Sequence, residues 1–124
     1  MFAGLIICAS LTAVDGDTVK CDGQNMRLLG EGVPFVSGID TPEIGSHAKC
    51  LKERKLALIA KDRLRELLAE KGLRVMFSGV ADKTPSHRPL INVYRANGEE
   101  IGKKLLREGI ARPWAPRQRN DWCD

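Results

Sequence analysis

Three short runs of apolar and β-branched residues open the chain, and an Asp-Gly pair separates each run from the next. The runs cover residues 5–14, 18–22 and 24–29, and the pairs are Asp15-Gly16 and Asp22-Gly23. An Asp-Gly pair between two such runs favours a tight hairpin turn, because both residue types tolerate a positive φ angle. The pattern therefore predicts an antiparallel meander of three strands.

The hydrophobic period changes to that of a helix at two places further along the chain. The longer pattern has apolar residues at three- and four-residue intervals with charged residues between them, at Leu56, Ile59, Ala60, Leu64 and Leu67. It predicts an amphipathic helix from Ser46, as its N-cap, to about residue 71, where Gly72 ends it. A shorter pattern predicts a second helix that ends at Gly109 and contains Ile101, Leu105 and Leu106.

Two more runs, residues 73–80 and 90–96, are typical of strands, and Asn97-Gly98 follows the second. A loop rich in Gly and Pro is expected from residue 30 to 45, and an irregular tail from Arg112 onward. Five strands with a helix inserted after the third form the layout of an OB-fold. We therefore predict one α+β domain over residues 1–124, mainly a five-stranded Greek-key β barrel with two or three helices.

Charge and length narrow the class of protein. Twenty Lys and Arg against sixteen Asp and Glu give a net charge of +4, a mild excess that suits a polyanionic partner. The apolar start, residues 1–14, is too short to span a bilayer and lacks the basic region and cleavage site of a signal peptide. We interpret it as the first strand, with any leader already removed, and we expect a monomer without membrane contact.

Four cysteines, Cys8, Cys21, Cys50 and Cys123, match no paired zinc-binding pattern, and only two histidines accompany them. Disulfides explain them better. Cys8 and Cys21 flank the Asp15-Gly16 turn almost symmetrically, and Cys50 and Cys123 would then tie the long helix to the tail. This pairing predicts an oxidising compartment, so a secreted or periplasmic protein. The alternative is a cytosolic protein with four reduced, buried thiols.

The residues suited to catalysis gather in four short stretches. They are Asp15-Gly16-Asp17-Thr18, Arg27-Leu28-Leu29-Gly30, Ile39-Asp40-Thr41-Pro42-Glu43 and His87-Arg88-Pro89-Leu90. The predicted fold offers three carboxylates and two guanidinium groups to one end of the barrel. Phosphodiester hydrolysis requires such a set, because it needs oxygen ligands for a hard cation, a base for water and cations against the developing phosphoryl charge.

These stretches, in this order, resemble the staphylococcal nuclease (thermonuclease) family over about residues 11–114, in a secreted or periplasmic homologue of the bacterial type. The resemblance implies that Asp17 and Asp40 bind Ca²⁺ through their carboxylates and Thr41 through its main-chain carbonyl. It also implies that Glu43 is the general base or orients the attacking water. Arg27 and Arg88 then match the two arginines that hold the phosphate in the transition state.

The chain departs from the family pattern in two places. Residues 31–38 intervene between the RLLG and IDTPE stretches, and Arg27 keeps its place only if this segment loops out rather than extending the strand. In residues 83–88 the tyrosine that contacts the nucleotide's phosphate in the family is missing. Each candidate also has an ordinary alternative, because acids in turns and arginines on surfaces are common.

Three hypotheses follow for the function. The first is a Ca²⁺-dependent nuclease with low sequence specificity, acting on single-stranded or denatured DNA and RNA. The alternative is a catalytically weak or inactive OB-fold module that binds nucleic acid. A structural or interaction domain that merely inherited the motif is the third.

Overall fold

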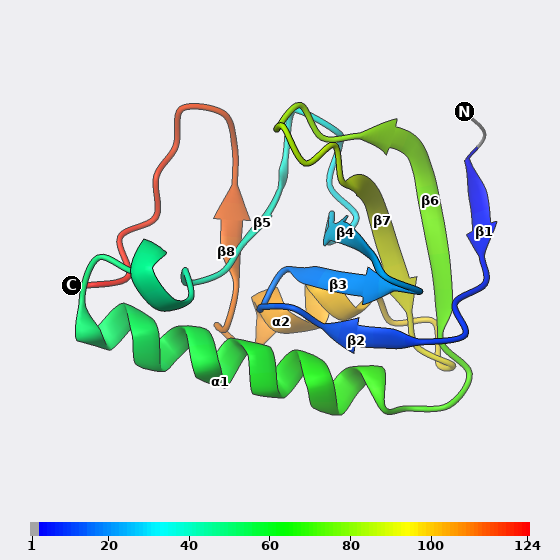
Figure 1. Cartoon of the computed structure of the whole chain (residues 1–124), viewed down its shortest axis with the longest axis horizontal. Helices are drawn as coiled ribbons and strands as arrows, with labels where there is room; N and C mark the ends of the chain where they lie inside the picture. Colours follow the sequence, from blue (N-terminus) through cyan, green and yellow to red (C-terminus); the bar gives the residue numbers. More distant parts are fainter. Residues whose placement is uncertain (1–2) are drawn as a thin grey trace.

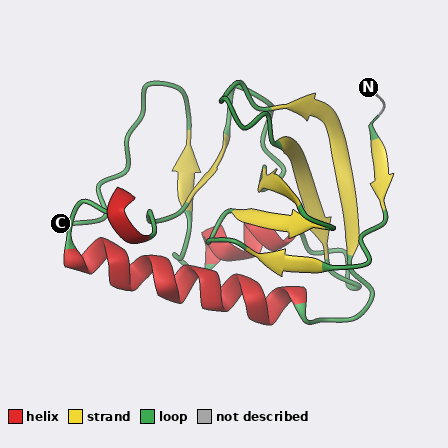
Figure 2. Cartoon of the chain, viewed as in Figure 1, coloured by secondary structure: helices red, strands yellow, loops and turns green. Residues whose placement is uncertain are grey.

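The computed structural model describes residues 3–124, which form an α+β fold built on a curled sheet (Figure 1, Figure 2). The six-stranded sheet has the strand order β1-β6-β7-β4-β3-β2, and β5 and β8 form a separate two-stranded sheet. The strands are Gly4–Ile6 (β1), Leu11–Ala13 (β2), Thr18–Cys21 (β3), Gln24–Leu28 (β4), Gly38–Asp40 (β5), Arg74–Ala81 (β6), Pro89–Tyr94 (β7) and Arg112–Trp114 (β8). The helices are Leu51–Leu68 (α1), Ile101–Arg107 (α2) and the 3₁₀ turn Gly45–His47 (η1). The predicted fold class, the antiparallel meander and the OB-like arrangement are confirmed.

The first predicted strand, residues 5–14, is divided into β1 and β2, which lie at opposite ends of the strand order. β1 pairs with β6, and β2 pairs with β3. Because residues 7–10 alone separate the two pieces, the sheet must curl until its ends approach each other, as Figure 1 shows at β1 and β2. Asp22 fixes the break, since its carboxylate accepts hydrogen bonds from the backbone N–H groups of Ala9 and Ser10 at 3.1 and 2.7 Å.

The long helix begins at Leu51 rather than at Ser46, and Cys50 is its N-cap. The buried carboxylate of Glu53 causes this difference. It accepts hydrogen bonds from the backbone N–H groups of Glu43 and Lys49, both at 2.9 Å, and so holds the preceding segment across the first turn instead of in line with the helix. At its other end, the helix stops at Leu68, a few residues before the predicted end.

The core lies between the curled sheet and the two helices. The sheet contributes Val19, Leu28, Ile91 and Val93, and the helices contribute Leu64, Leu67, Ile101 and Leu105, which the helical patterns included. Ile59, which the pattern of the long helix also included, is 56% exposed. Removing the apolar surface of the core from water is the main favourable term in folding, so the core fixes the barrel on which the loops are mounted.

The tail contains a strand that the sequence pattern did not predict. β8 pairs antiparallel with β5, which lies inside the predicted loop, and this pairing sets Asp40 opposite Arg112. The tail was therefore wrongly predicted to be irregular throughout. Both strands are three residues long and about seventy residues apart, so neither shows the alternation that marks a strand locally.

Both predicted disulfides are present, joining Cys8 to Cys21 and Cys50 to Cys123. The second ties the start of α1 to the tail, where Trp122 is buried and its ring lies 4.1 Å from the guanidinium carbon of Arg112. Among the described residues, no helix combines the length and apolarity needed to cross a membrane.

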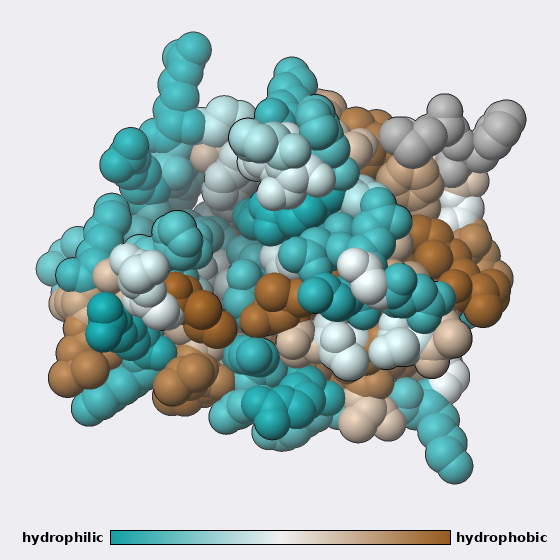
Figure 3. All heavy atoms as spheres, viewed as in Figure 1, coloured by the Kyte–Doolittle hydropathy of each residue, from teal (hydrophilic) through white to brown (hydrophobic). Residues whose placement is uncertain are grey.

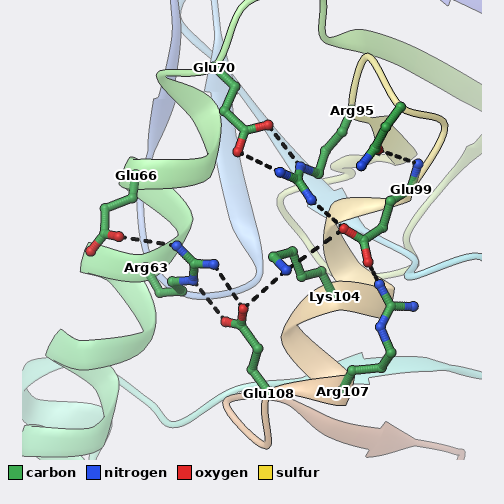
Figure 4. Close-up of polar contacts among 9 residues, drawn as sticks. Arg63, Glu66, Glu70, Arg95, Glu99, Lys104, Arg107 and Glu108 are labelled. Carbon is green, nitrogen blue, oxygen red and sulfur yellow. Dashed lines mark hydrogen bonds and ion pairs between the residues drawn. The ribbon is translucent and has the colours of Figure 1, made fainter.

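A network of charged side chains joins the C-terminal part of α1 to α2 and to the turn that precedes α2 (Figure 4). Arg63 Nε lies 2.8 Å from Glu108 Oε1, and Arg95 Nε lies 2.8 Å from Glu70 Oε1. The other members of the network are Glu66, Glu99, Lys104 and Arg107. Exposed ion pairs are screened by salt, so we assign this network a modest role in orienting the two helices.

Hydrophilic side chains cover most of the face drawn in Figure 3, with hydrophobic patches over β1 and along α1. In and next to these two elements, the large apolar side chains that are more than half exposed are Leu5, Ile7, Leu51, Leu58 and Ile59. None of them lines the cavity described below.

We expect removal of the Cys50–Cys123 bond to destabilise the protein more than removal of the Cys8–Cys21 bond. The bonded residues are 73 and 13 positions apart, and a disulfide that closes a longer loop restricts the unfolded chain more. Each paired Cys→Ser variant should lose about 2–4 kcal/mol in urea unfolding. The reverse order of the two losses would contradict the entropic explanation.

Candidate functional site

Gly16 lets the turn between β2 and β3 pack closely against Thr41, which directly follows β5, and against α1. A Cβ at Gly16 would lie 2.7 Å from both Thr41 Oγ1 and Ala60 Cβ, so only glycine permits this approach. Within the turn, Asp17 N donates to Asp15 Oδ1 at 3.0 Å. The turn thereby presents Asp17, which is 6% exposed, beside the end of β5.

A continuous path of polar contacts joins the two candidate arginines through Asp17. Arg27 Nη1 lies 3.3 Å from Asp17 Oδ2. Thr18 Oγ1 donates to Asp17 Oδ1 at 3.1 Å and accepts from Arg88 Nη1 at 3.0 Å. The sheet creates this arrangement, because Thr18 pairs with Arg27 across β3 and β4, and Arg27 pairs with Leu90 across β4 and β7. Both guanidinium groups therefore lie at the same end of the barrel.

Residues 31–38 loop out between β4 and β5 and leave Arg27 in place. Arg27 Nη2 donates to the carbonyl of Ile39 at 2.9 Å, directly beside Asp40. Gly32 N donates to Leu29 O at 3.0 Å, which turns the chain immediately after the strand. Of the two alternatives stated for this segment, the structure has the one that keeps Arg27 beside Asp17.

Asp82, which the sequence analysis did not single out, fixes Arg88. Arg88 donates to its carboxylate through both Nε, at 2.8 Å, and the backbone N, at 2.9 Å. Although burial opposes ionisation, hydrogen bonds from Thr84 and Arg88 hold the pKa of Asp82 below its usual value. A charged carboxylate therefore orients the guanidinium toward Thr18.

The remaining acids form a cluster with more negative charge than its surroundings neutralise. Burial, followed by the charges of Asp17 and Glu43, raises the pKa of Asp15 from 3.8 to about 7. Burial, with the charge of Asp17, raises the pKa of Asp40. Burial and the charges of Asp17 and Asp40 also raise the pKa of Glu43. Such a cluster attracts a cation and binds protons when none is available.

The tail supports Asp40 through a residue that the sequence analysis missed. Asn120 Nδ2 donates to Asp40 Oδ2 at 3.2 Å and to Pro113 O at 3.0 Å. The Cys50–Cys123 bond holds this part of the tail near α1. No local pattern marks Asn120, since its partner lies 80 residues earlier.

Glu43 lies on an exposed loop whose backbone Glu53 anchors. Glu53 is 4% exposed and stands at the third position after the Cys50 N-cap. An acid at this position is a signature of helix starts, and this signal could have identified Glu53 in the sequence.

A cavity of about 630 Å³ brings four of the six predicted residues together. Arg27, Asp40, Glu43 and Arg88 line it. The backbone segment of Thr41 borders a second hollow of about 260 Å³, which also contacts Asp40 and Glu43. Asp17 is joined to the cavity through Arg27. Trp114 lines both hollows.

Among residues 3–124, no three His, Cys, Asp or Glu side chains lie close enough together to hold a metal ion by themselves. The expected ligands are two carboxylates, of Asp17 and Asp40, and the carbonyl of Thr41, completed by water. All are oxygen donors in a cluster of excess negative charge, which fits a hard cation with flexible geometry such as Ca²⁺.

Comparison with known proteins gives one family. The family model described as staphylococcal nuclease homologue matches residues 35–122, well over half of the chain. This range contains Asp40, Thr41, Glu43 and Arg88, while Asp17 and Arg27 precede it. No curated protein matches the chain.

We expect Asp15→Asn to stabilise the metal-free protein at pH 8 and not at pH 4. A carboxyl whose pKa is raised on folding contributes stability below its unfolded pKa, and this contribution is lost as the pH rises through the folded pKa, here from 3.8 to about 7. Asn keeps the acceptor for Asp17 N without the charge. After allowance for partial exposure, the gain in unfolding free energy should be about 1–2 kcal/mol.

Urea unfolding of the variant and the wild type in EDTA, at both pH values, measures this difference. A variant that is less stable than the wild type at pH 8 would show that the Asp15 charge is compensated.

Proposed function

Because the chain belongs to the staphylococcal nuclease homologue family, we propose that it is a Ca²⁺-dependent nuclease that hydrolyses phosphodiester bonds of DNA and RNA with little sequence specificity. The observation that carries the proposal is the path Arg27–Asp17–Thr18–Arg88, which sets two guanidinium groups beside a carboxylate cluster at one cavity. Family membership supports a nuclease-type hydrolase, and the site geometry supports the finer assignment.

In this proposal Arg27 and Arg88 bind the phosphate of the scissile bond. Their planar guanidinium groups donate paired hydrogen bonds to phosphate oxygens, and these bonds strengthen as negative charge builds up. Asp82 and the Ile39 carbonyl hold the two side chains in advance, so little freedom is lost when the phosphate binds.

Asp17, Asp40 and the Thr41 carbonyl would hold the calcium ion. Bound there, the ion supplies positive charge that attracts the phosphate oxygens and offsets the repulsion among the acids. Burial and the nearby charge of Asp17 raise the pKa of Asp40 in the metal-free site, and a bound cation would relieve this penalty on its ionised form.

Glu43 takes the proton of the attacking water in the proposed reaction. Partial burial and its acidic neighbours raise the pKa of this carboxyl, which makes the carboxylate a stronger base than a fully solvated glutamate. Glu43 lines both hollows, which supports a role between the proposed ion site and the proposed phosphate site.

The proposed substrates are single-stranded or denatured DNA and RNA, because a cavity of this size admits an unpaired nucleotide more readily than a duplex. A net charge of +4 favours any polyanion without choosing a sequence. Two disulfides fit a secreted or periplasmic protein, and we propose that it acts there as a monomer.

The direct test uses a fluorescent single-stranded oligonucleotide with Ca²⁺ and then with EDTA. We expect cleavage with Ca²⁺ and none with EDTA. Glu43→Gln should lower kcat at least about 100-fold, because it removes the base while its exposed side chain leaves the fold unchanged. Glu66→Gln, on the exposed face of α1, is the matched control and should cleave normally.

Undiminished cleavage in EDTA would exclude the metal-dependent reaction. Tight binding of the oligonucleotide without product would instead favour the nucleic-acid-binding module.

Asn120→Ala should weaken Ca²⁺ binding about 10-fold, because loss of the hydrogen bond to Asp40 leaves that carboxylate free to turn. Isothermal titration calorimetry measures the affinity. Gln118→Ala, in the same tail and lining the same hollow, is the control and should bind Ca²⁺ normally. Equal affinities for the two variants would show that Asn120 supports the tail alone.

A further inference from the structure

Phe35 is held in a backbone conformation that large side chains avoid. Its φ angle is 66°, in the left-handed region, and it stands in the segment that departs from the family pattern. A bulky residue in this region is rare, and such strain persists where the surrounding structure imposes it, frequently at functional sites. The strained backbone at Phe35 therefore points to a functional reason for the position of its ring.

Close internal contacts impose the conformation. The backbone N–H groups of Val36 and Ser37 both donate to Val33 O at 2.9 Å, and Val33 N donates to Ser37 Oγ at 2.9 Å. Gly32 leaves no room for a side chain, because a Cβ there would lie 2.4 Å from Ser37 O. Residues 32–37 thus form a compact loop rather than an open one.

The base of this loop is tied to the sheet. Glu31 N donates to Asn92 Oδ1 at 2.8 Å, and Tyr94 OH donates to Glu31 Oε2 at 3.1 Å. Asn92 and Tyr94 both belong to β7. Lys103 on α2 adds an ion pair with Glu31 at 3.6 Å. The loop is consequently mounted on the same strand, β7, that follows Arg88.

The loop directs one aromatic ring to the cavity. Phe35 lines the cavity together with Arg27, Arg88 and Glu43, while Val33 and Val36 of the same loop do not. Phe35 is 37% exposed, and Lys83 Nζ lies 4.5 Å from its ring centroid. A cation over one face of the ring holds the ring in place.

We propose that Phe35 is a stacking platform for an unpaired base of the nucleotide whose phosphate Arg27 and Arg88 bind, and that it makes the protein prefer single strands. This inference rests on the proposed function, since it uses the same phosphate site. The base stacks against the ring of Phe35 inside a cavity large enough for a nucleotide. Every base has an aromatic face, so the platform adds affinity without reading sequence.

The preference for single strands follows from the geometry of bases in a duplex. A paired base is already stacked on its neighbours and must be pulled out before it can reach Phe35, which costs free energy. An unpaired base reaches Phe35 at a lower cost in free energy. Residues 83–88 contain no tyrosine, so the loop supplies an aromatic contact that this segment does not.

The decisive variant is Phe35→Gly, because glycine accepts a φ of 66° without strain. We expect its urea midpoint to equal or exceed that of the wild type, while its affinity for a single-stranded oligonucleotide falls about 10-fold. Fluorescence anisotropy in EDTA, where no cleavage is expected, measures the affinity. Phe35→Trp keeps an aromatic ring and should bind about as tightly as the wild type. Val36→Ala, at an exposed position of the same loop, should also bind as the wild type does.

Two small ligands then test the base contact without cleavage. Thymidine 3′,5′-bisphosphate should bind the wild type about 10-fold more tightly than deoxyribose 3′,5′-bisphosphate, and Phe35→Gly should not distinguish them. Normal binding of both ligands by Phe35→Gly would overturn the platform, although cleavage by the wild type would still uphold the proposed function. Base-dependent binding through Phe35 without any cleavage would uphold the platform and overturn the nuclease.

Discussion

The buried carboxylate of Asp17 is the interaction on which the site depends, because it joins two arginines from different strands. Arg27 contacts it directly, and Arg88 reaches it through the Thr18 hydroxyl. Asp17 adds a shared partner to the contacts that each guanidinium makes separately, which are those of Arg88 with Asp82 and of Arg27 with the Ile39 carbonyl. The parallel pairing of β4 with β7 brings the two strands together, and the Asp17 contacts convert that proximity into a shared direction. The site is thus a consequence of strand register as much as of residue type.

This arrangement concentrates acids whose charges repel one another, and the structure around them opposes that repulsion. Gly16 packs the turn against α1, Glu53 anchors the loop that carries Glu43, and the second disulfide holds Asn120 beside Asp40. Each contact is made outside the cavity itself. A site with unfavourable internal charge needs such external support, and it gains stability when a cation binds.

The second disulfide and the strained loop both position segments outside the six-stranded sheet beside the site. The Cys50–Cys123 bond fastens the tail to the start of α1, in addition to the pairing of β8, the burial of Trp122 and the hydrogen bond of Asn120 to Asp40. The segment at residues 31–38 keeps Arg27 in place because it turns away from the sheet at Gly32. It also brings Phe35 to the cavity, so this segment contributes a side chain to the lining of the site.

The sequence by itself determined the features that depend on near neighbours: the Asp-Gly turns, the period of α1, the Cys8–Cys21 pair across a hairpin, and the residue types suited to phosphate and calcium. Tertiary structure decided the rest. The pairing of β5 with β8, the support of Asp40 by Asn120 and the direction of Phe35 join residues whose local sequences carry no periodic signal. The start of α1 also differs from the prediction, because Glu53 bonds to the backbone of Glu43, 10 residues earlier. Contacts between remote segments are selected by packing of the whole chain, and a local pattern contains no record of them.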